Sequence, residues 1–300
     1  MTTRRRFLTI SAAAVTFPSL SNGAPVYTWQ GVALGARATL RLTHPDAKEI
    51  SKKVATEISR FEDIFSLYRR DSSLTQLNLT GRLEYPPFEL LECLSLAGAA
   101  HKASGGRFDP SIQPLWACYA EASAYGKLPS ANAIALAQIG WERVRIDTSV
   151  IELQSDMAIT LNGIAQGYIA DRIAEMLTAD GLSNILINTG EFRAVGAHPN
   201  GGAWPVKLKG GGEVSLIARA LASSAPLGTT FDQNSLVGHI LDPRSRRPAQ
   251  SRWREITISA KSAALADALS TAACLFENRT DMNRFVAQFD DAAIEQAAPA

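Results

Sequence analysis

The sequence has 300 residues, of which 46% are hydrophobic and 20% are charged. This is an ordinary globular composition, and the chain is long enough to bury a sizeable core. Its 30 basic and 29 acidic residues leave a formal net charge of +1, so no overall positive field would attract nucleic acid or an anionic membrane surface. A nucleic-acid-binding protein is therefore a poor interpretation.

The start of the chain is typical of a targeting segment. Three arginines at positions 4–6 precede the uncharged run 7–17, which is much shorter than the roughly 20 residues of a membrane-spanning helix. The order Arg-Arg-Arg-Phe-Leu is similar to a twin-arginine export signal. We therefore expect residues 1–24 to be a twin-arginine export signal that directs the protein to the periplasm, and residues 25–300 to form a single domain.

Hydrophobic periodicity predicts the first elements of that domain. Residues 36–43 alternate as a strand does, and the next pattern has the period of a helix capped by Asp46. A second helical pattern begins after Pro87 and ends at Gly105, and His101 within it is expected to be a partly buried or surface residue rather than a ligand.

From Trp141 onward, strands dominate the expected structure. Two helices, at 164–177 and 263–276, interrupt strands expected at 144–146, 150–153, 159–161, 185–188, 206–208, 214–217 and 256–259. Gly210 to Gly212 are expected to form a hairpin turn, and the last twenty residues a final helix with a loose tail. Strands and helices do not alternate regularly, which favours an α+β fold with a mixed sheet and flanking helices.

The three cysteines are too few and too widely spaced to predict a zinc site. A disulfide between Cys93 and Cys118 is one interpretation in an oxidising compartment, and small buried side chains are the simpler one.

Several polar residues lie in apolar surroundings and could bind a ligand. The run 161–168, Leu-Asn-Gly-Ile-Ala-Gln-Gly-Tyr, leaves a strand and enters a helix through glycines, which suits contact with phosphate or metal as well as tight strand–helix packing. Asp267, Ser270 and Thr271 have helical i, i+3, i+4 spacing, so their oxygens share one face. That set suits Mg²⁺, although a polar stripe facing solvent would have the same pattern.

Two further segments contain candidate residues. His239 could transfer a proton near neutral pH with Asp242 orienting it, or it could be a structural histidine. Tyr68 and the pair Phe108 and Asp109 place aromatic rings and a carboxylate at loop edges, where a planar ring could stack or where a turn could simply pack.

Taken together and in this order, the segments resemble the ApbE family of FAD:protein FMN transferases, from Leu34 to the helix containing Thr271. The amino-acid sequences of residues 161–168 and 223–228, together with the twin-arginine start, are similar to those of the NosX-type branch of nitrous oxide reductase accessory proteins.

The resemblance implies a function and a set of site residues. FAD would be the donor and Mg²⁺ the cofactor. A Ser or Thr of an exported or membrane flavoprotein, such as one of the NosR type, would accept FMN, with release of AMP. His239 would be catalytic. The residues matching the FAD-binding positions are Leu34, Tyr68, Phe108, Asp109, Thr160, Gln166 and Leu241, and those matching the Mg²⁺ ligands are Gly163, Asp267, Ser270 and Thr271.

The sequence also departs from the family pattern at three positions. Thr160 and Gln166 are neutral where many relatives are charged, and Glu191 follows Gly190 where a second glycine is usual. Two other functions therefore stay open: a non-catalytic periplasmic FAD-binding protein, and an FAD pyrophosphatase that releases FMN and AMP.

Overall fold

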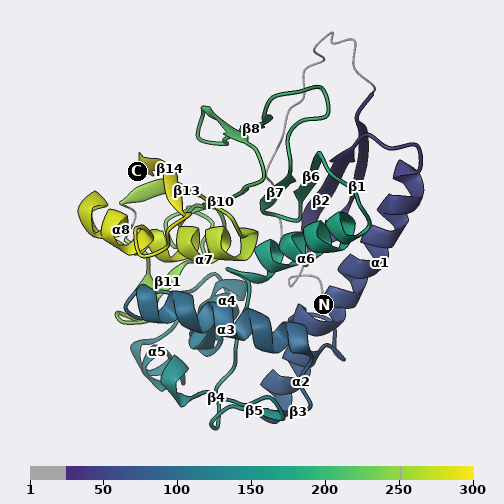
Figure 1. The fold of residues 1–300 in the computed structure, drawn as a ribbon. Coiled ribbons are helices and arrows are strands. Elements are labelled where there is room, and N and C mark those ends of the chain that lie inside the picture. Colours follow the sequence, from purple (N-terminus) through teal and green to yellow (C-terminus); the bar gives the residue numbers. More distant parts are fainter. Residues whose placement is uncertain (1–24, 251) are drawn as a thin grey trace.

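Seven antiparallel strands form the main sheet of the computed structural model, which describes residues 25–250 and 252–300 (Figure 1). The expected export signal at 1–24 lies outside the described residues. In spatial order the strands are β1 (Tyr27–Ala33), β2 (Ala36–Leu42), β6 (Ile185–Asn188), β7 (Phe192–Val195), β10 (Ala220–Ser224), β13 (Trp253–Ala260) and β14 (Ala293–Pro299).

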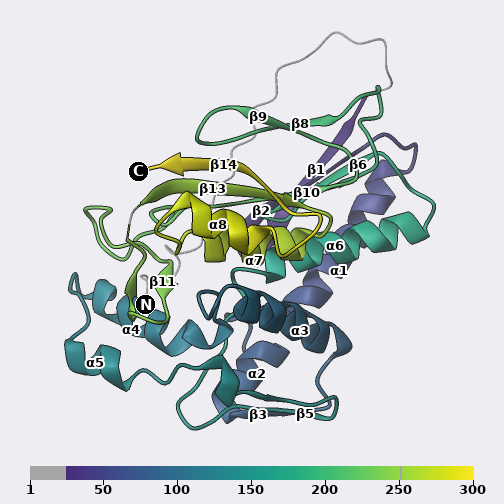
Figure 2. The same cartoon turned by 60° about the vertical axis from the view of Figure 1, so that its left-hand side comes forward.

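Helices cover one face of this sheet. They are α1 (Ala47–Phe65), α6 (Ala165–Ala179), α7 (Ala263–Ala273) and α8 (Arg279–Val286) (Figure 2). Ile256 and Ile258 on the covered face are fully buried in the main core. On the other face lies the hairpin of β8 (Trp204–Lys207) and β9 (Glu213–Leu216), where the buried Trp204 packs on the sheet. The glycine turn expected within this hairpin is confirmed, with positive φ at Gly211 and Gly212.

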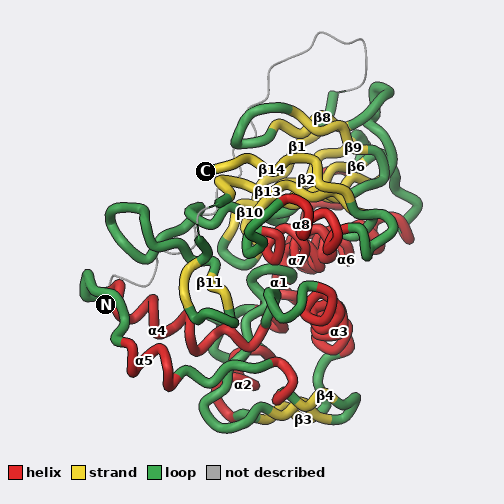
Figure 3. The backbone as a smooth tube through the Cα atoms, turned by 90° about the vertical axis from the view of Figure 1, so that its left-hand side faces the viewer, coloured by secondary structure: helices red, strands yellow, loops and turns green. Residues whose placement is uncertain are grey.

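A second group of helices lies beyond α6 and α7, and a small three-stranded sheet lies at its far side (Figure 3). The helices are α2 (Ser73–Thr80), α3 (Phe88–Ala103), α4 (Gln113–Ala124) and α5 (Ala131–Leu136), with short 3-10 helices at Pro110–Ile112 and Trp141–Arg143. The small sheet contains β3 (Arg82–Glu84), β5 (Val150–Glu152) and β4 (Arg145–Ile146), and a separate hairpin contains β11 (Leu241–Asp242) and β12 (Arg247–Pro248).

The expected α+β class is confirmed, and the strongly periodic helices form close to their expected limits. Asp46 is the N-cap residue of α1 as expected, but its side chain makes no capping hydrogen bond. The disulfide interpretation is wrong: Cys93 and Cys274 are buried free thiols, and Cys118 is a half-buried one.

The strand expected at 159–161 does not form. The Asn78 side chain binds both backbone groups of Ile159, accepting from its N–H (2.7 Å) and donating to its carbonyl (2.8 Å). The N–H of Thr160 donates to the carbonyl of Pro110 (2.8 Å). These partners replace the ladder that a strand would need, so the segment is extended but pairs with no neighbouring strand.

The loose tail expected at the end of the chain is wrong as well. Residues Ala293–Pro299 form the edge strand β14 along β13. This segment is rich in alanine and has no clear alternation of apolar and polar side chains, so its sequence predicts no strand. Pairing with β13 supplies the backbone hydrogen bonds that stabilise it.

Candidate functional site

Three expected site residues from three separate segments meet where α6 and α7 come together. A Cβ atom added at Gly163 would lie 3.0 Å from Thr271 Oγ1 and 3.2 Å from Phe108 Cε2. Gly163 therefore lets the backbone before α6 lie directly against α7 and the ring of Phe108.

Asp267 lies inside the protein, one turn before Thr271. It is 4% exposed, and its carboxylate accepts a hydrogen bond from the Gly167 N–H at 3.4 Å. Burial raises the pKa of Asp267 to about 8, because a desolvated carboxylate with weak hydrogen bonding favours the protonated form. The solvent-facing polar stripe is thus the wrong interpretation of this helix.

A chain of hydroxyl groups joins α7 to the end of β10. Ser224 Oγ lies 2.7 Å from Ser270 Oγ and 3.3 Å from Thr271 Oγ1, and Ser270 Oγ also donates to the carbonyl of Asp267 (3.0 Å). Ser270 is fully buried, whereas Thr271 is partly exposed. These contacts hold the hydroxyl-bearing turn of α7 at the end of the strand.

Asp171 on α6 determines where α7 begins. Its carboxylate accepts from the N–H groups of Ala263 and Ala264, each at 2.9 Å, and from Ser262 Oγ at 2.7 Å. Arg193 lies 3.1 Å from the same carboxylate. A partly buried acid that satisfies the first amides of a helix fixes its position, so Asp171 orients the helix that carries Asp267.

Glu191 is a second buried acid at this site. It is 8% exposed and accepts from the Ser223 N–H at 3.2 Å. Burial, with a smaller contribution from the charge of Asp267, raises its pKa. In the sequence, Glu191 is visible only as a departure from the family pattern, because it stands where a second glycine is usual. Gln166 lies against the preceding residue, Gly190, since a Cβ there would lie 2.5 Å from Gln166 Oε1.

His239 is held by a carbonyl. Its Nδ1 lies 3.0 Å from the carbonyl oxygen of Thr229, and its own N–H donates to the same oxygen at 3.1 Å. Burial lowers its pKa, which favours neutral imidazole. A carbonyl only accepts, so the neutral ring carries its proton on Nδ1 and leaves the lone pair on Nε2. The orienting role expected of Asp242 is wrong, because its carboxylate pairs with Arg244 (2.7 Å).

The loop that carries His239 returns to the end of β10. A Cβ at Gly238 would lie 2.1 Å from the carbonyl oxygen of Pro226, a distance that no side chain tolerates. Pro226 follows Ser224 by two residues, so this close approach places the His239 segment beside the hydroxyl chain of α7.

Phe108, Asp109 and Thr160 lie close together, since Thr160 binds the carbonyl of Pro110. The Asp109 carboxylate caps a 3-10 turn by accepting from Ser111 N–H (2.8 Å) and Oγ (2.6 Å). Leu241, by contrast, is 6% exposed in a small apolar cluster with Tyr119 and Phe231. The Leu241 side chain is part of the hydrophobic core, so a flavin contact at this position would involve the Leu241 backbone.

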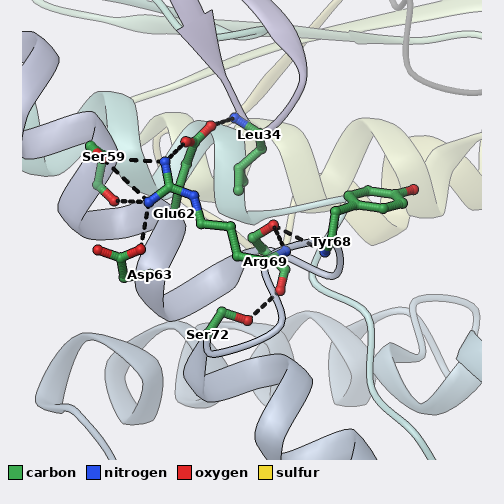
Figure 4. A network of polar contacts seen from close by, with 8 residues as sticks. Leu34, Ser59, Glu62, Asp63, Tyr68, Arg69 and Ser72 are labelled. Atoms are coloured by element: carbon green, nitrogen blue, oxygen red, sulfur yellow. Dashed lines mark hydrogen bonds and ion pairs between the residues drawn. The ribbon is translucent and has the colours of Figure 1, made fainter. Parts of the chain in front are cut away.

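Leu34 and Tyr68 lie beside the end of α1 (Figure 4). Leu34 is in the turn between β1 and β2 with φ +47°, and Tyr68 is 56% exposed on the loop after α1. Figure 4 shows the Tyr68 ring pointing away from the polar network beneath it.

The donor set at Asp267 fits a hard cation. One carboxylate, the Thr271 hydroxyl and the adjacent Gly163 backbone are oxygen donors of the kind that Mg²⁺ prefers. Within the described part of the chain, no group of three His, Cys, Asp or Glu side chains gathers as a metal site. A cation held by so few protein oxygens would keep coordination positions for substrate oxygens and water.

Comparison of the sequence with protein-family models decides the family. A family model described as the ApbE family matches residues 34–294. The chain belongs to the ApbE family. An FAD:protein FMN transferase of Klebsiella pneumoniae is 28% identical to this member, over 78% of this chain and 77% of the relative.

Solved ApbE structures have the same fold. The ApbE protein of Thermotoga maritima has a TM-score of 0.79 at 25% identity, covering 90% of this chain and 94% of that one. The apo flavinyl transferase ApbE of Pseudomonas stutzeri has a TM-score of 0.77 at 24% identity, covering 90% and 89%. Among the described residues, no helix is long and apolar enough to cross a membrane.

Proposed function

We propose that this ApbE-family protein is an FAD:protein FMN transferase. The observation that carries the proposal is the burial of the Asp267 carboxylate beside the hydroxyls of Ser270 and Thr271, where Gly163 and Phe108 also meet. The curated relatives that match most of the chain have this activity in their names.

The reaction moves FMN from one oxygen to another. A Ser or Thr hydroxyl of the acceptor protein attacks the FMN phosphorus, the phosphoanhydride bond of FAD breaks, and AMP leaves. With Nδ1 bound to the Thr229 carbonyl, His239 accepts the hydroxyl proton at Nε2. Asp267 and Thr271, with the Gly163 backbone, would hold Mg²⁺, and a cation bound there would neutralise charge on the pyrophosphate.

The remaining contacts to FAD are proposed from their places around this centre. Phe108 lies against Gly163, and Asp109 follows Phe108 in the chain. Thr160 precedes α6, and Gln166 is in its first turn. Leu34 and Tyr68 would bind another part of the dinucleotide. Ser270 supports Thr271 through Ser224.

The biological setting is proposed from the sequence. The twin-arginine start supports periplasmic export. The NosX-like sequences at 161–168 and 223–228 support a role in nitrous oxide reductase maturation or electron supply, with a NosR-type membrane protein as acceptor.

One alternative has a structural observation in its favour. Glu191 adds a second buried acid where FAD phosphates would approach, and Thr160 and Gln166 are neutral. These features favour a non-catalytic FAD-binding protein, which would bind FAD and release no AMP.

A single assay separates the possible functions. The protein is incubated with FAD and Mg²⁺, with and without an exported candidate acceptor, and AMP and acceptor mass are measured. A transferase adds an FMN-sized mass to an acceptor Ser or Thr and releases AMP only when acceptor is present. AMP release without acceptor indicates a pyrophosphatase, and FAD binding without AMP indicates a binding protein.

Variants test the assigned roles. We expect Asp267→Ala to lower the transfer rate at least about 100-fold and His239→Asn to lower it by about 10²–10⁴-fold. Asp180→Asn, at an exposed ion pair with Lys53, is the matched control and should transfer at the wild-type rate. Full transfer by Asp267→Ala would contradict the proposal.

A further inference from the structure

One carboxylate connects two segments that are far apart in the sequence. Glu62 lies in the last turns of α1, between the β1–β2 turn and the loop at 66–72 (Figure 4). Its Oε1 accepts from the Leu34 N–H at 2.9 Å, and its Oε2 accepts from the Arg69 guanidinium. Each oxygen therefore serves a different segment.

The β1–β2 turn needs this support. Leu34 and Gly35 have φ of +47° and +83°, as in the two-residue turns that glycine and asparagine normally occupy. A leucine in the left-handed region is strained by roughly 1 kcal/mol or more. The bond from its N–H to Glu62 fixes the strained residue in place.

The loop at 66–72 is held in several ways. The N–H groups of Tyr68 and Arg69 both donate to Ser66 Oγ at 3.0 Å. The Arg69 guanidinium also binds the Ser59 carbonyl (3.0 Å) and Asp63 (2.5 Å) on α1. The backbone under Tyr68 is thus fixed while its ring stays 56% exposed, which is the arrangement of a preformed stacking surface.

We propose that Glu62 is a positioning residue that holds the Leu34 turn and the Tyr68 loop in the relative geometry that binds FAD. The inference rests on the proposed function, because Leu34 and Tyr68 are its proposed flavin contacts. Glu62 itself reaches no flavin in this assignment: it acts through the Leu34 amide and the Arg69 guanidinium. The class of ligand is a flavin dinucleotide, and the effect of Glu62 is preorganisation of its site.

Two substitutions separate the two halves of the bridge. Glu62→Ala removes both bonds. Glu62→Gln keeps an oxygen that can accept from Leu34 but turns an NH₂ group toward Arg69. Only the Tyr68 loop then loses its contact with position 62, while Arg69 keeps its bonds to Ser59 and Asp63. Glu57→Gln is the matched control, because Glu57 lies on the same helix and pairs with Arg60 instead.

The first measurement is amide hydrogen exchange of the full chain without ligand. We expect Glu62→Ala to speed exchange at least about tenfold in peptides covering both 33–36 and 66–72. Glu62→Gln should speed it in the second peptide alone, and Glu57→Gln in neither. Unchanged exchange in either segment of Glu62→Ala overturns the inference. If Glu62→Ala does not fold, unchanged exchange of the 66–72 peptide in Glu62→Gln overturns it.

The second measurement is FAD affinity by flavin fluorescence. We expect Glu62→Ala to weaken FAD binding about tenfold and Glu62→Gln by a smaller factor, while the Mg²⁺-dependent rise in Tm stays as in the wild type. A general loss of folding would reduce both responses, so this split distinguishes positioning from simple destabilisation. Wild-type affinity in both variants overturns the inference. Absence of FAD binding by the wild type overturns the proposed function instead, together with the flavin role of Glu62.

Discussion

The Asp267 carboxylate is unfavourably placed for a charged group. It is almost completely buried, its closest donor is one amide at 3.4 Å, and Glu191 lies near enough for each charge to disfavour the other. Two such acids lower the stability of the protein when both are ionised, and a bound cation reverses that effect.

This arrangement predicts an unusual pH dependence. The pKa of Asp267 is raised from 3.8 to about 8, so between these values the folded protein holds a proton that the unfolded chain releases. Stability of the metal-free protein therefore falls as pH rises through this window, by up to about 1.4 kcal/mol per pH unit from this group. The raised pKa of Glu191 acts in the same direction.

Denaturant unfolding in EDTA across this pH range checks the prediction. Asp267→Asn, which stays neutral, should have a flatter profile than the wild type, and Asp180→Asn should match the wild type. Added Mg²⁺ should stabilise the wild type at pH 8 but not Asp267→Asn. Equal slopes for Asp267→Asn and the wild type would refute this account of the pH dependence.

Between elements, Gly167 determines how closely α6 approaches α7. A Cβ at this position would lie 2.2 Å from the Ala263 carbonyl oxygen, at the start of α7. The contact is with backbone, which cannot move aside as a flexible side chain can. The same approach brings the Gly167 N–H to Asp267, so the packing of the two helices also sets this hydrogen bond to the carboxylate.

We therefore expect Gly167→Ala to destabilise the protein by about 3 kcal/mol, because the helices must separate. Gly210→Ala is the control: a Cβ there meets only ordinary contacts, at 3.4 Å or more, and Gly210 is not in the left-handed region. It should change stability by less than about 1 kcal/mol. Thermal unfolding of both variants measures the difference, and equal Tm values would contradict the proposed steric contact.

Over the whole molecule, the end of the chain completes the main sheet. β14 pairs with β13 from Trp253 to Ser259, and the last six residues of β13 are buried. α7 follows β13 directly, so the helix that carries Asp267 depends on a strand whose outer side is covered by the last residues of the chain.

Deletion of residues 293–300 should expose β13 as an unpaired edge. We expect a loss of at least about 2 kcal/mol, equivalent to about 4–8 °C in Tm, together with self-association through the open edge. Deletion of Ala300 alone leaves β14 intact and should be almost neutral. Size-exclusion chromatography and thermal unfolding measure both effects. A monomeric truncated protein with wild-type Tm would show that β14 is dispensable.

The sequence by itself determined the family, the α+β class and the helices with strong apolar periodicity, because these depend on local patterns and on motifs in order. Tertiary structure decided which groups are partners. His239 binds the Thr229 carbonyl instead of Asp242, and Asn78 binds Ile159 across 81 residues in place of a strand. β14 exists because β13 lies beside it. Such contacts depend on the order of strands and on helix packing, which bring together residues that no local pattern relates. Glu191 beside Asp267 and Glu62 between two loops follow from the same packing.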